Sequence, residues 1–346
     1  MRLVELIRCS DAARALPSAS PDVEVERSVC DRLYGDRAQV TATPLAHGAA
    51  PLGRLVGGRY RLVERFGAGG MAIVYRARDE QLERDVAVKV IGEGHARDPL
   101  FVRRFRWEAQ LGARLAHPNI VAVLDAGAQP RDFIVTELVR GLDAATLLHR
   151  RGPLTPGETI DIVVQVCDAL SHAHGRDVLH VDVSPSNVLI AEADGTAKLA
   201  DFGLASDAIE SPISRVGEVM GTPGYVAPEI TCGAKPSPRS DLFSLGAVAY
   251  RLLLGPQVPP ADPGCTAPLP TAVRRMPSLS EARPGLPRGL YEAVHQALAP
   301  DPDARQESVA QFRAQLLDGH APSRGPWRGG GVPVPNAVRS QIRSAA

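Results

Sequence analysis

Short apolar and β-branched runs, separated by glycine-rich or aspartate-containing turns, dominate the chain from Tyr60 to Ile91. Arg59–Val63 and Asp85–Val90 are two of these runs, and such runs are typical of strands joined by turns. Two more strand-like runs follow at 120–124 and 133–138. The pattern predicts a small antiparallel sheet.

One helix interrupts these predicted strands. Asp98 and Pro99 are suited to the N-cap and the first helical position. Phe101, Phe105 and Leu115 follow near helical spacing. The sheet is therefore expected to carry one helix that begins at residue 99.

After Gly141 the pattern becomes mainly helical. Thr155 and Glu158 form a capping-box sequence ahead of an apolar series at helical spacing. The segment 241–254 is apolar on nearly every side, which predicts a helix buried at the centre of a helical region. Residues 255–288 contain nine prolines, so an irregular surface segment is expected there.

Composition and charge narrow the class of protein. The chain has 346 residues, of which 44% are hydrophobic and 23% charged, so it can bury a sizeable core. Its 39 basic and 39 acidic residues balance, so we expect no general attraction to nucleic acid or to an anionic membrane. No apolar run is long enough for a membrane span, which predicts a cytoplasmic protein. The five cysteines are scattered without a C-x-x-C pair, which disfavours a disulfide framework or a zinc site.

The first candidate for chemistry is a glycine-rich run between two predicted strands. It consists of Phe66, Gly67, Ala68, Gly69, Gly70, Met71, Ala72, Ile73 and Val74. Glycines let the backbone approach a polyanion and direct N–H groups at it, although a tight hairpin is an equally simple interpretation. A dinucleotide-binding turn is disfavoured, because no helix opens after the run.

The second candidate is Lys89, which stands in the middle of an apolar strand. The chain has only three lysines and otherwise uses arginine for positive charge. A buried ammonium is costly unless it meets an anion. Glu108 follows 19 residues later in the predicted helix and is a plausible counter-ion, whereas snorkelling of the lysine to the surface is the alternative.

The third candidate is a pair of acidic residues with an amide beside short predicted strands. Asp182 could accept a hydroxyl proton. Asn187 and Asp201 offer the hard oxygen ligands that Mg²⁺ prefers. Asp201 alone could be a turn residue, but the order and spacing of the three make that interpretation improbable.

These motifs occur in one fixed order, which ends with Asp201-Phe202-Gly203 and then the run Gly-Tyr-Val-Ala-Pro-Glu at 224–229. In this order the chain resembles the bacterial members of the eukaryotic-like serine/threonine protein kinase family. The runs 106–109, 117–121 and 303–305 are also similar to that bacterial branch. The resemblance covers about residues 58–317.

The resemblance implies an α+β, bilobal, protein-kinase-like fold. An N-lobe of small antiparallel sheet and one key helix would span about 58–139, and a larger, mainly helical C-lobe about 140–317. A flexible leader at 1–57 and a flexible C-terminal tail at 318–346 would flank this domain.

The resemblance also implies ATP and Mg²⁺ as cofactors and assigns the catalytic roles. Lys89, paired to Glu108, would bind the α- and β-phosphates, and Asp182 would position and deprotonate the acceptor hydroxyl. Asn187 and Asp201 would hold Mg²⁺.

Further residues would bind the nucleotide or support the site. The glycine-rich run would cover the phosphates, and the adenine would contact the backbone from Glu137 to Val139 and the side chains of Val74, Ala87 and Leu189, with Thr136 at the rear. Asp241 would brace the catalytic loop, and Glu229 would pair with Arg305.

Four positions depart from the family pattern. Ala72 replaces the third glycine of the loop. Gly112 stands where the family usually has a large apolar residue, so the helix that carries Glu108 is expected to be mobile. Val181 replaces the arginine of His-Arg-Asp, and Ser184 replaces the lysine that helps to neutralise the transferring phosphoryl group.

These departures leave three functions open. The first is an active ATP-dependent serine/threonine protein kinase in cytosolic signalling, with protein substrates and possible autophosphorylation. The second is a pseudokinase that acts as an ATP-binding scaffold. The third is a small-molecule phosphotransferase, which is disfavoured because residues 221–229 resemble a peptide-docking loop. Ser206, Ser211, Ser214 and Thr222 are candidate phosphorylation sites, with weak effects expected because Val181 cannot hold a phosphate.

Overall fold

The computed structural model describes residues 50–68, 72–202, 221–256 and 277–318. The expected leader up to residue 49 and the expected tail from residue 319 lie outside these residues.

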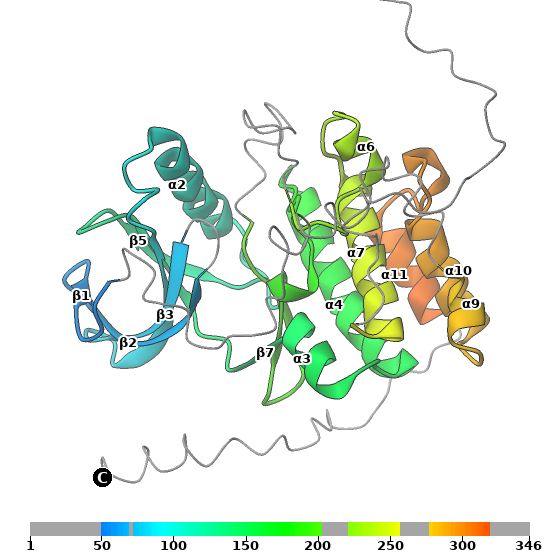
Figure 1. Ribbon diagram of the computed structural model, residues 1–346, viewed down its shortest axis with the longest axis horizontal. Helices are drawn as coiled ribbons and strands as arrows, with labels where there is room; N and C mark the ends of the chain where they lie inside the picture. Colours follow the sequence, from blue (N-terminus) through cyan, green and yellow to red (C-terminus); the bar gives the residue numbers. More distant parts are fainter. Residues whose placement is uncertain (1–49, 69–71, 203–220, 257–276, 319–346) are drawn as a thin grey trace, which may run out of the picture. The chain divides into compact units, whose positions relative to one another are not determined.

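The first part of the described chain forms an antiparallel sheet with the strand order β1-β2-β3-β4-β6-β5 (Figure 1). Its strands are β1 (Leu55–Val56), β2 (Tyr60–Ala68), β3 (Ala72–Asp79), β4 (Arg84–Ile91), β5 (Val123–Gly127) and β6 (Phe133–Glu137). Helix α2 (Pro99–Ala113) connects β4 to β5 and lies along one side of this sheet (Figure 1). The predicted small sheet with one helix is therefore confirmed.

The sheet starts earlier than the sequence pattern predicted. Leu55 and Val56 pair with β2, and the Val56 side chain is buried. Ala50 N–H donates to the Tyr75 hydroxyl at 2.9 Å. Residues 50–57, which the sequence pattern assigned to the leader, therefore include residues that complete the edge of the sheet.

The strand predicted at 120–124 is displaced by three residues. Ile120 forms a parallel bridge with Leu199, and Val121 N–H donates to the Leu199 carbonyl at 2.9 Å. β5 begins only at Val123. Residues 120–121 are apolar because they join the sheet region to the second part of the chain.

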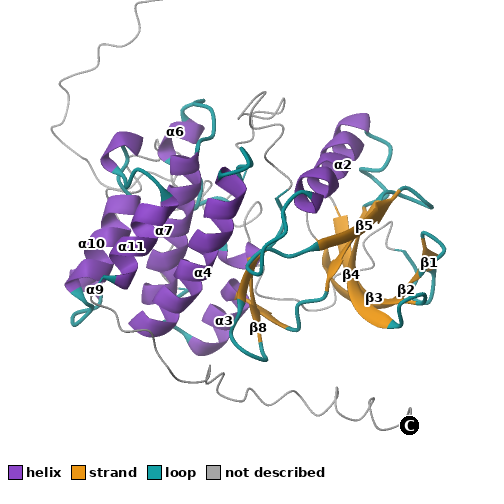
Figure 2. Ribbon diagram, turned by 180° about the vertical axis from the view of Figure 1, so that it is seen from behind, coloured by secondary structure: helices purple, strands orange, loops and turns teal. Residues whose placement is uncertain are grey.

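The second part is mainly helical and includes a small sheet of three strands (Figure 2). The strands are β7 (Gly141–Asp143), β8 (Val188–Ala191) and β9 (Ala197–Leu199). The helices are α3 (Ala144–Arg151), α4 (Pro156–His174), α6 (Pro228–Thr231), α7 (Pro238–Leu254), α9 (Leu279–Ala282), α10 (Arg288–Ala297) and α11 (Val309–Leu317), with the short 3₁₀ helices η1 (Pro185–Asn187) and η2 (Pro302–Ala304). In the described ranges, no helix is both long and apolar enough to cross a membrane.

Local sequence signals explain where these helices begin. Asp98 caps α2 by accepting from Leu100 N–H, and Thr155 and Glu158 form the predicted capping box of α4. α7 is buried on almost every side and packs against α4 and α10, as predicted for a central helix.

The proline-rich segment is not irregular throughout. Residues 257–276 lie outside the described chain, but α9 forms within the predicted irregular segment. Leu279 of α9 is fully buried against the helical core, because one apolar residue suffices to anchor this short turn.

A buried ion pair joins α6 to the end of the domain. The Arg305 guanidinium binds both carboxylate oxygens of Glu229 at 2.7 and 2.8 Å and stacks over the Phe243 ring. Arg305 also donates to the carbonyls of Ala299 and Arg239. The predicted pairing of Glu229 with Arg305 is confirmed.

A second buried carboxylate, Asp79, closes the turn between β3 and β4. It accepts two hydrogen bonds of 2.7 Å from Arg59 and further bonds from the N–H groups of Gln81 and Leu82. The Arg59 hydrogen bonds lower the pKa of Asp79 to about 2. Asp79 therefore stabilises the fold when ionised.

We expect Asp79→Asn to lower the free energy of unfolding at neutral pH by about 2 kcal/mol, because an amide cannot bind the guanidinium in the same way. This difference should be complete above the unfolded-state pKa of about 4 and should shrink as pH falls toward 2, where wild-type Asp79 also becomes protonated. Urea unfolding over this pH range measures it. The control is Glu80→Gln, which removes an exposed pair with Arg61 and should have little effect. Equal losses in both variants would contradict the assignment.

Candidate active site

The strand register places the predicted nucleotide-contacting residues on one face of the sheet. Val74 lies opposite Lys89, and Thr136 lies opposite Ala87. Ala87 and Lys89 are two residues apart on β4, so their side chains share a face. Val74, Ala87, Lys89 and Thr136 are all half-buried. Together they form a semi-enclosed surface with one positive charge.

Lys89 makes ion pairs with two carboxylates from distant segments. Its Nζ lies 2.7 Å from Glu108 Oε1 on α2 and 3.1 Å from Asp201 Oδ1, which follows β9. The predicted counter-ion Glu108 is therefore in place, and the lysine does not snorkel to the surface. The structure thus brings together three of the residues that the sequence singled out.

Lys89 and Asp201 stabilise each other's charge, whereas burial raises the pKa of Glu108. Burial alone would lower the pKa of Lys89, but Asp201 and Glu108 together raise this pKa above its ordinary value. The positive charge of Lys89 in turn lowers the pKa of Asp201. At neutral pH the cluster therefore contains an ammonium and an ionised Asp201, whose side chain is 51% exposed and accessible to a cation.

The glycine-rich run divides into two structural groups. Phe66 is 53% exposed near the end of β2, and Gly67, which pairs with Val74 of β3, has open space beside it, because a Cβ there would contact nothing within 4 Å. Ala72 and Ile73 are buried in the core of the sheet region. Ala68 is the last residue of β2. Gly69, Gly70 and Met71 lie outside the described residues.

Asp182 is held by uncharged hydrogen-bond donors. Asn187 Nδ2 donates to its backbone carbonyl at 2.8 Å and to Oδ2 at 3.1 Å. The backbone N–H and the hydroxyl of Thr222 donate to Oδ1 at 2.7 and 2.6 Å. The carboxylate is thus fixed in one orientation while its residue stays half-buried rather than sealed.

Asp241 braces the loop that carries Asp182, as predicted. Its buried carboxylate accepts from the N–H groups of His180 and Val181 at 2.9 and 2.8 Å and from His174 Nε2 at 2.8 Å. Burial would raise the pKa of Asp241, but the hydrogen bond and the charge of His174 hold it below its ordinary value. Val181 has a φ of 71°, which is unfavourable for a β-branched residue, so Asp241 holds the loop in a conformation it would otherwise leave.

His180 connects this loop to the Asp-Phe-Gly segment. Its Nε2 donates to the Ala200 carbonyl at 2.8 Å, and its Nδ1 accepts from Asp182 N–H at 3.2 Å. The His180 ring lies 4.6 Å from the buried Phe202 ring. Asp182 and Asp201 are therefore tied to a common framework.

The remaining predicted residues lie at the end of β6, in β8 and in η1. Glu137 ends β6 and Val139 follows it, while Leu189 is half-buried on β8. Asn187 uses its amide nitrogen on Asp182, which leaves its side-chain oxygen for another partner. Asn187 and Asp201 thus supply hard oxygen donors of the kind that Mg²⁺ binds.

Two residues of the site were not found from the sequence. Thr222 was named only as a candidate phosphorylation site, and its hydroxyl is bound to Asp182. Lys198 forms an ion pair of 2.9 Å with Glu137, which also accepts from Ala122 N–H. One available signal for Lys198 was the rarity of lysine in this chain.

Comparison with known proteins identifies close relatives of this arrangement. Residues 60–309 match the family described as "Protein kinase domain". The chain is 40% identical over 275 residues to serine/threonine-protein kinase PknB of Mycobacterium tuberculosis, a match that covers 76% of this chain and 43% of that kinase. Serine/threonine-protein kinase PrkC of Bacillus subtilis is 34% identical over 266 residues, covering 77% of this chain and 41% of PrkC.

A solved structure shows the same fold. The crystal structure of the Mycobacterium tuberculosis PknI kinase domain (C20A_R136A double mutant) matches with a TM-score of 0.64 and 35% identity, over 78% of this chain and 98% of that chain. The predicted bilobal α+β fold is confirmed. The chain spans less than half the length of the two curated relatives.

We expect Asp241→Asn to lower the free energy of unfolding by about 3 kcal/mol, because its amide nitrogen would face N–H donors in a buried site. The matched control is Asp303→Asn, whose side chain is 90% exposed and should change stability by less than about 0.5 kcal/mol. Denaturant unfolding of both variants measures the difference. A loss no larger than that of the control would show that Asp241 does not hold the loop.

Proposed function

Because the chain belongs to the protein kinase family, we propose that it transfers the γ-phosphate of Mg-ATP to serine or threonine hydroxyls of proteins. The resemblance to bacterial eukaryotic-like serine/threonine kinases is confirmed by its relatives. The observation that carries the proposal is the position of Lys89 between Glu108 and Asp201, with both ion pairs formed. This arrangement offers one cation to phosphate oxygens and one exposed carboxylate to a metal ion.

Each site residue has a proposed task. Lys89, oriented by Glu108, binds the α- and β-phosphates, and Asn187 and Asp201 hold Mg²⁺. When bound, Mg²⁺ neutralises charge on the phosphate oxygens. Asp182 orients the acceptor hydroxyl and takes its proton, since Thr222 and Asn187 fix its carboxylate.

Adenine recognition is proposed for the face that holds Val74 and Ala87, with Leu189 on the opposite side. The backbone between Glu137 and Val139 would supply the hydrogen bonds to the base. The Glu137 side chain is already bound to Lys198 and to Ala122 N–H, so the proposal assigns recognition of the base to the backbone and not to this side chain.

The substitutions at 181 and 184 do not favour a scaffold over an enzyme. Ser184 is fully buried, and its hydroxyl lies 3.2 Å from that of Ser186, so it leaves Asp182 and Asn187 in place. The resemblance of residues 221–229 to a peptide-docking loop favours a docked peptide as acceptor over a small molecule, and Thr222 of this run is bound to Asp182. The proposal includes protein substrates and autophosphorylation. It also places the activity in the cytoplasm, where ATP is available.

Phosphate transfer tests the proposed function. Wild-type protein incubated with Mg-ATP and a generic acceptor, myelin basic protein, should gain phosphate on serine or threonine, read by intact mass and site mapping. Asp182→Asn should lower the rate by at least about 100-fold, because the general base is lost. The control is Asp194→Asn, an exposed carboxylate away from the site. No transfer by the wild type, with Mg-ATP still bound, would reject the kinase proposal.

Phosphatase treatment tests the consequence of Val181. Ser206, Ser211 and Ser214 lie outside the described residues, and Thr222 is engaged with Asp182. A phosphate on one of these residues would lack a guanidinium partner at position 181. Removing phosphate should therefore change kcat by less than about threefold. Val181→Arg should make the rate more dependent on phosphorylation. A large loss in the phosphatase-treated wild type would contradict this view.

A further inference from the structure

Helix α2 lies against β5 at Gly112. Gly112 is buried, and a Cβ built on it would lie 2.6 Å from Val123 Cγ2. Carbon atoms at van der Waals contact are about 3.5–4.0 Å apart. With helix and strand at their present separation, the Val123 side chain therefore leaves no room for a side chain at residue 112.

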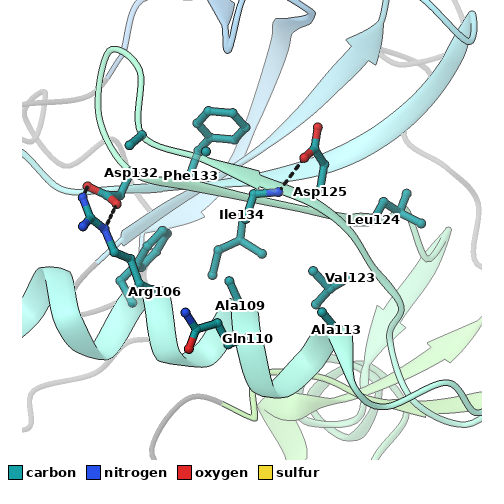
Figure 3. Close-up of a pocket in the computed structure, with 14 residues that line it drawn as sticks. Arg106, Ala109, Gln110, Ala113, Val123, Leu124, Asp125, Asp132, Phe133 and Ile134 are labelled. Carbon is teal, nitrogen blue, oxygen red and sulfur yellow. Dashed lines mark hydrogen bonds and ion pairs between the residues drawn. The ribbon is translucent and has the colours of Figure 1, made fainter.

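A cavity lies beside this contact, next to the buried cluster in which Phe105 and Ala109 of α2 pack with Ile134. The cavity has a volume of about 420 Å³ and lies between α2 and the strands β5 and β6. Figure 3 shows Ala109 and Ala113 of α2 facing Ile134 and Val123 across it. These alanines are small and leave the cavity open, and the Gly112 contact with Val123 is a point where the helix lies directly against β5.

Gly112 is one helical turn after Glu108, so the two residues lie on neighbouring positions of one helix face. A shift of α2 at Gly112 would also move Glu108, whose Oε1 lies 2.7 Å from Lys89 Nζ. We propose that Gly112 is a positioning residue: its missing side chain seats α2 against Val123 at the distance that lets Glu108 reach Lys89. This inference rests on the proposed kinase function.

The proposal reverses the interpretation based on sequence alone. A glycine inside a helix costs about 1 kcal/mol relative to alanine, which suggested a mobile helix. If Gly112 were only a missing apolar side chain, a larger residue would strengthen the helix and the site. If Gly112 seats the helix, a larger residue must push it away from β5. The two views predict opposite effects on activity.

The test is the pair Gly112→Leu and Gly112→Leu with Val123→Ala. We expect Gly112→Leu to lower kcat about tenfold with little change in the KM for the acceptor protein, because Glu108 is displaced from Lys89. Shortening Val123 should restore most of this loss. The matched control is Gly94→Leu, since a Cβ at the exposed Gly94 would meet nothing within 4 Å.

Wild-type or higher activity of Gly112→Leu would overturn the proposal, as would a loss that Val123→Ala does not relieve. If Gly112→Leu does not fold, Gly112→Ala is the second variant and should show a smaller fall in kcat, despite the better helix propensity of alanine. Amide hydrogen exchange of residues 105–113 gives a readout that does not require activity. Faster exchange in Gly112→Leu, reversed in the double variant, is expected even if the wild type transfers no phosphate, so the two proposals fail separately.

Discussion

A buried ammonium needs nearby anions, and the ion pairs of Lys89 that meet this need link the sheet region to the rest of the chain. Lys89 projects from an apolar strand and would be strongly destabilising without anions. Its two carboxylates come from α2 and from the segment after β9, so one side chain joins three elements. In the proposed complex with Mg-ATP, phosphate oxygens would bind Lys89 and the metal ion would bind Asp201. The ligand would thus replace the direct ion pair between these two residues.

A second carboxylate, Asp241, links segments of the helical part. It is buried on α7 and holds two successive N–H groups of the loop before Asp182. This explains how Val181 can keep a left-handed conformation. Asp182 therefore depends on a rigid core helix, whereas Glu108 depends on a helix that borders a cavity. The two halves of the site differ in how firmly they are held.

Sequence patterns predicted the order of elements and the main charged residues, because strand runs, capping residues and motif spacing are local signals. They did not predict that Ile120 and Val121 join β9, since apolar residues in a bridge and in a strand look alike. They also could not show how close Val123 lies to Gly112, because helix propensity describes the helix alone and not the side chain opposite it. Thr222 was missed for a related reason: its hydrogen bond to Asp182 spans 40 residues.

In the proposed function, Ser184 stands where the family pattern has a lysine, and Lys89 is the cation assigned to the phosphates. In the described part of the chain, the hydrogen bonds to Asp182 come from uncharged groups of Asn187 and Thr222. A developing negative charge on a phosphoryl group near Asp182 would therefore find its protein cation at Lys89. Since Lys89 is oriented by Glu108, the placement of α2 matters more here than in a relative that keeps both lysines. The departures at 112 and 184 are then physically connected.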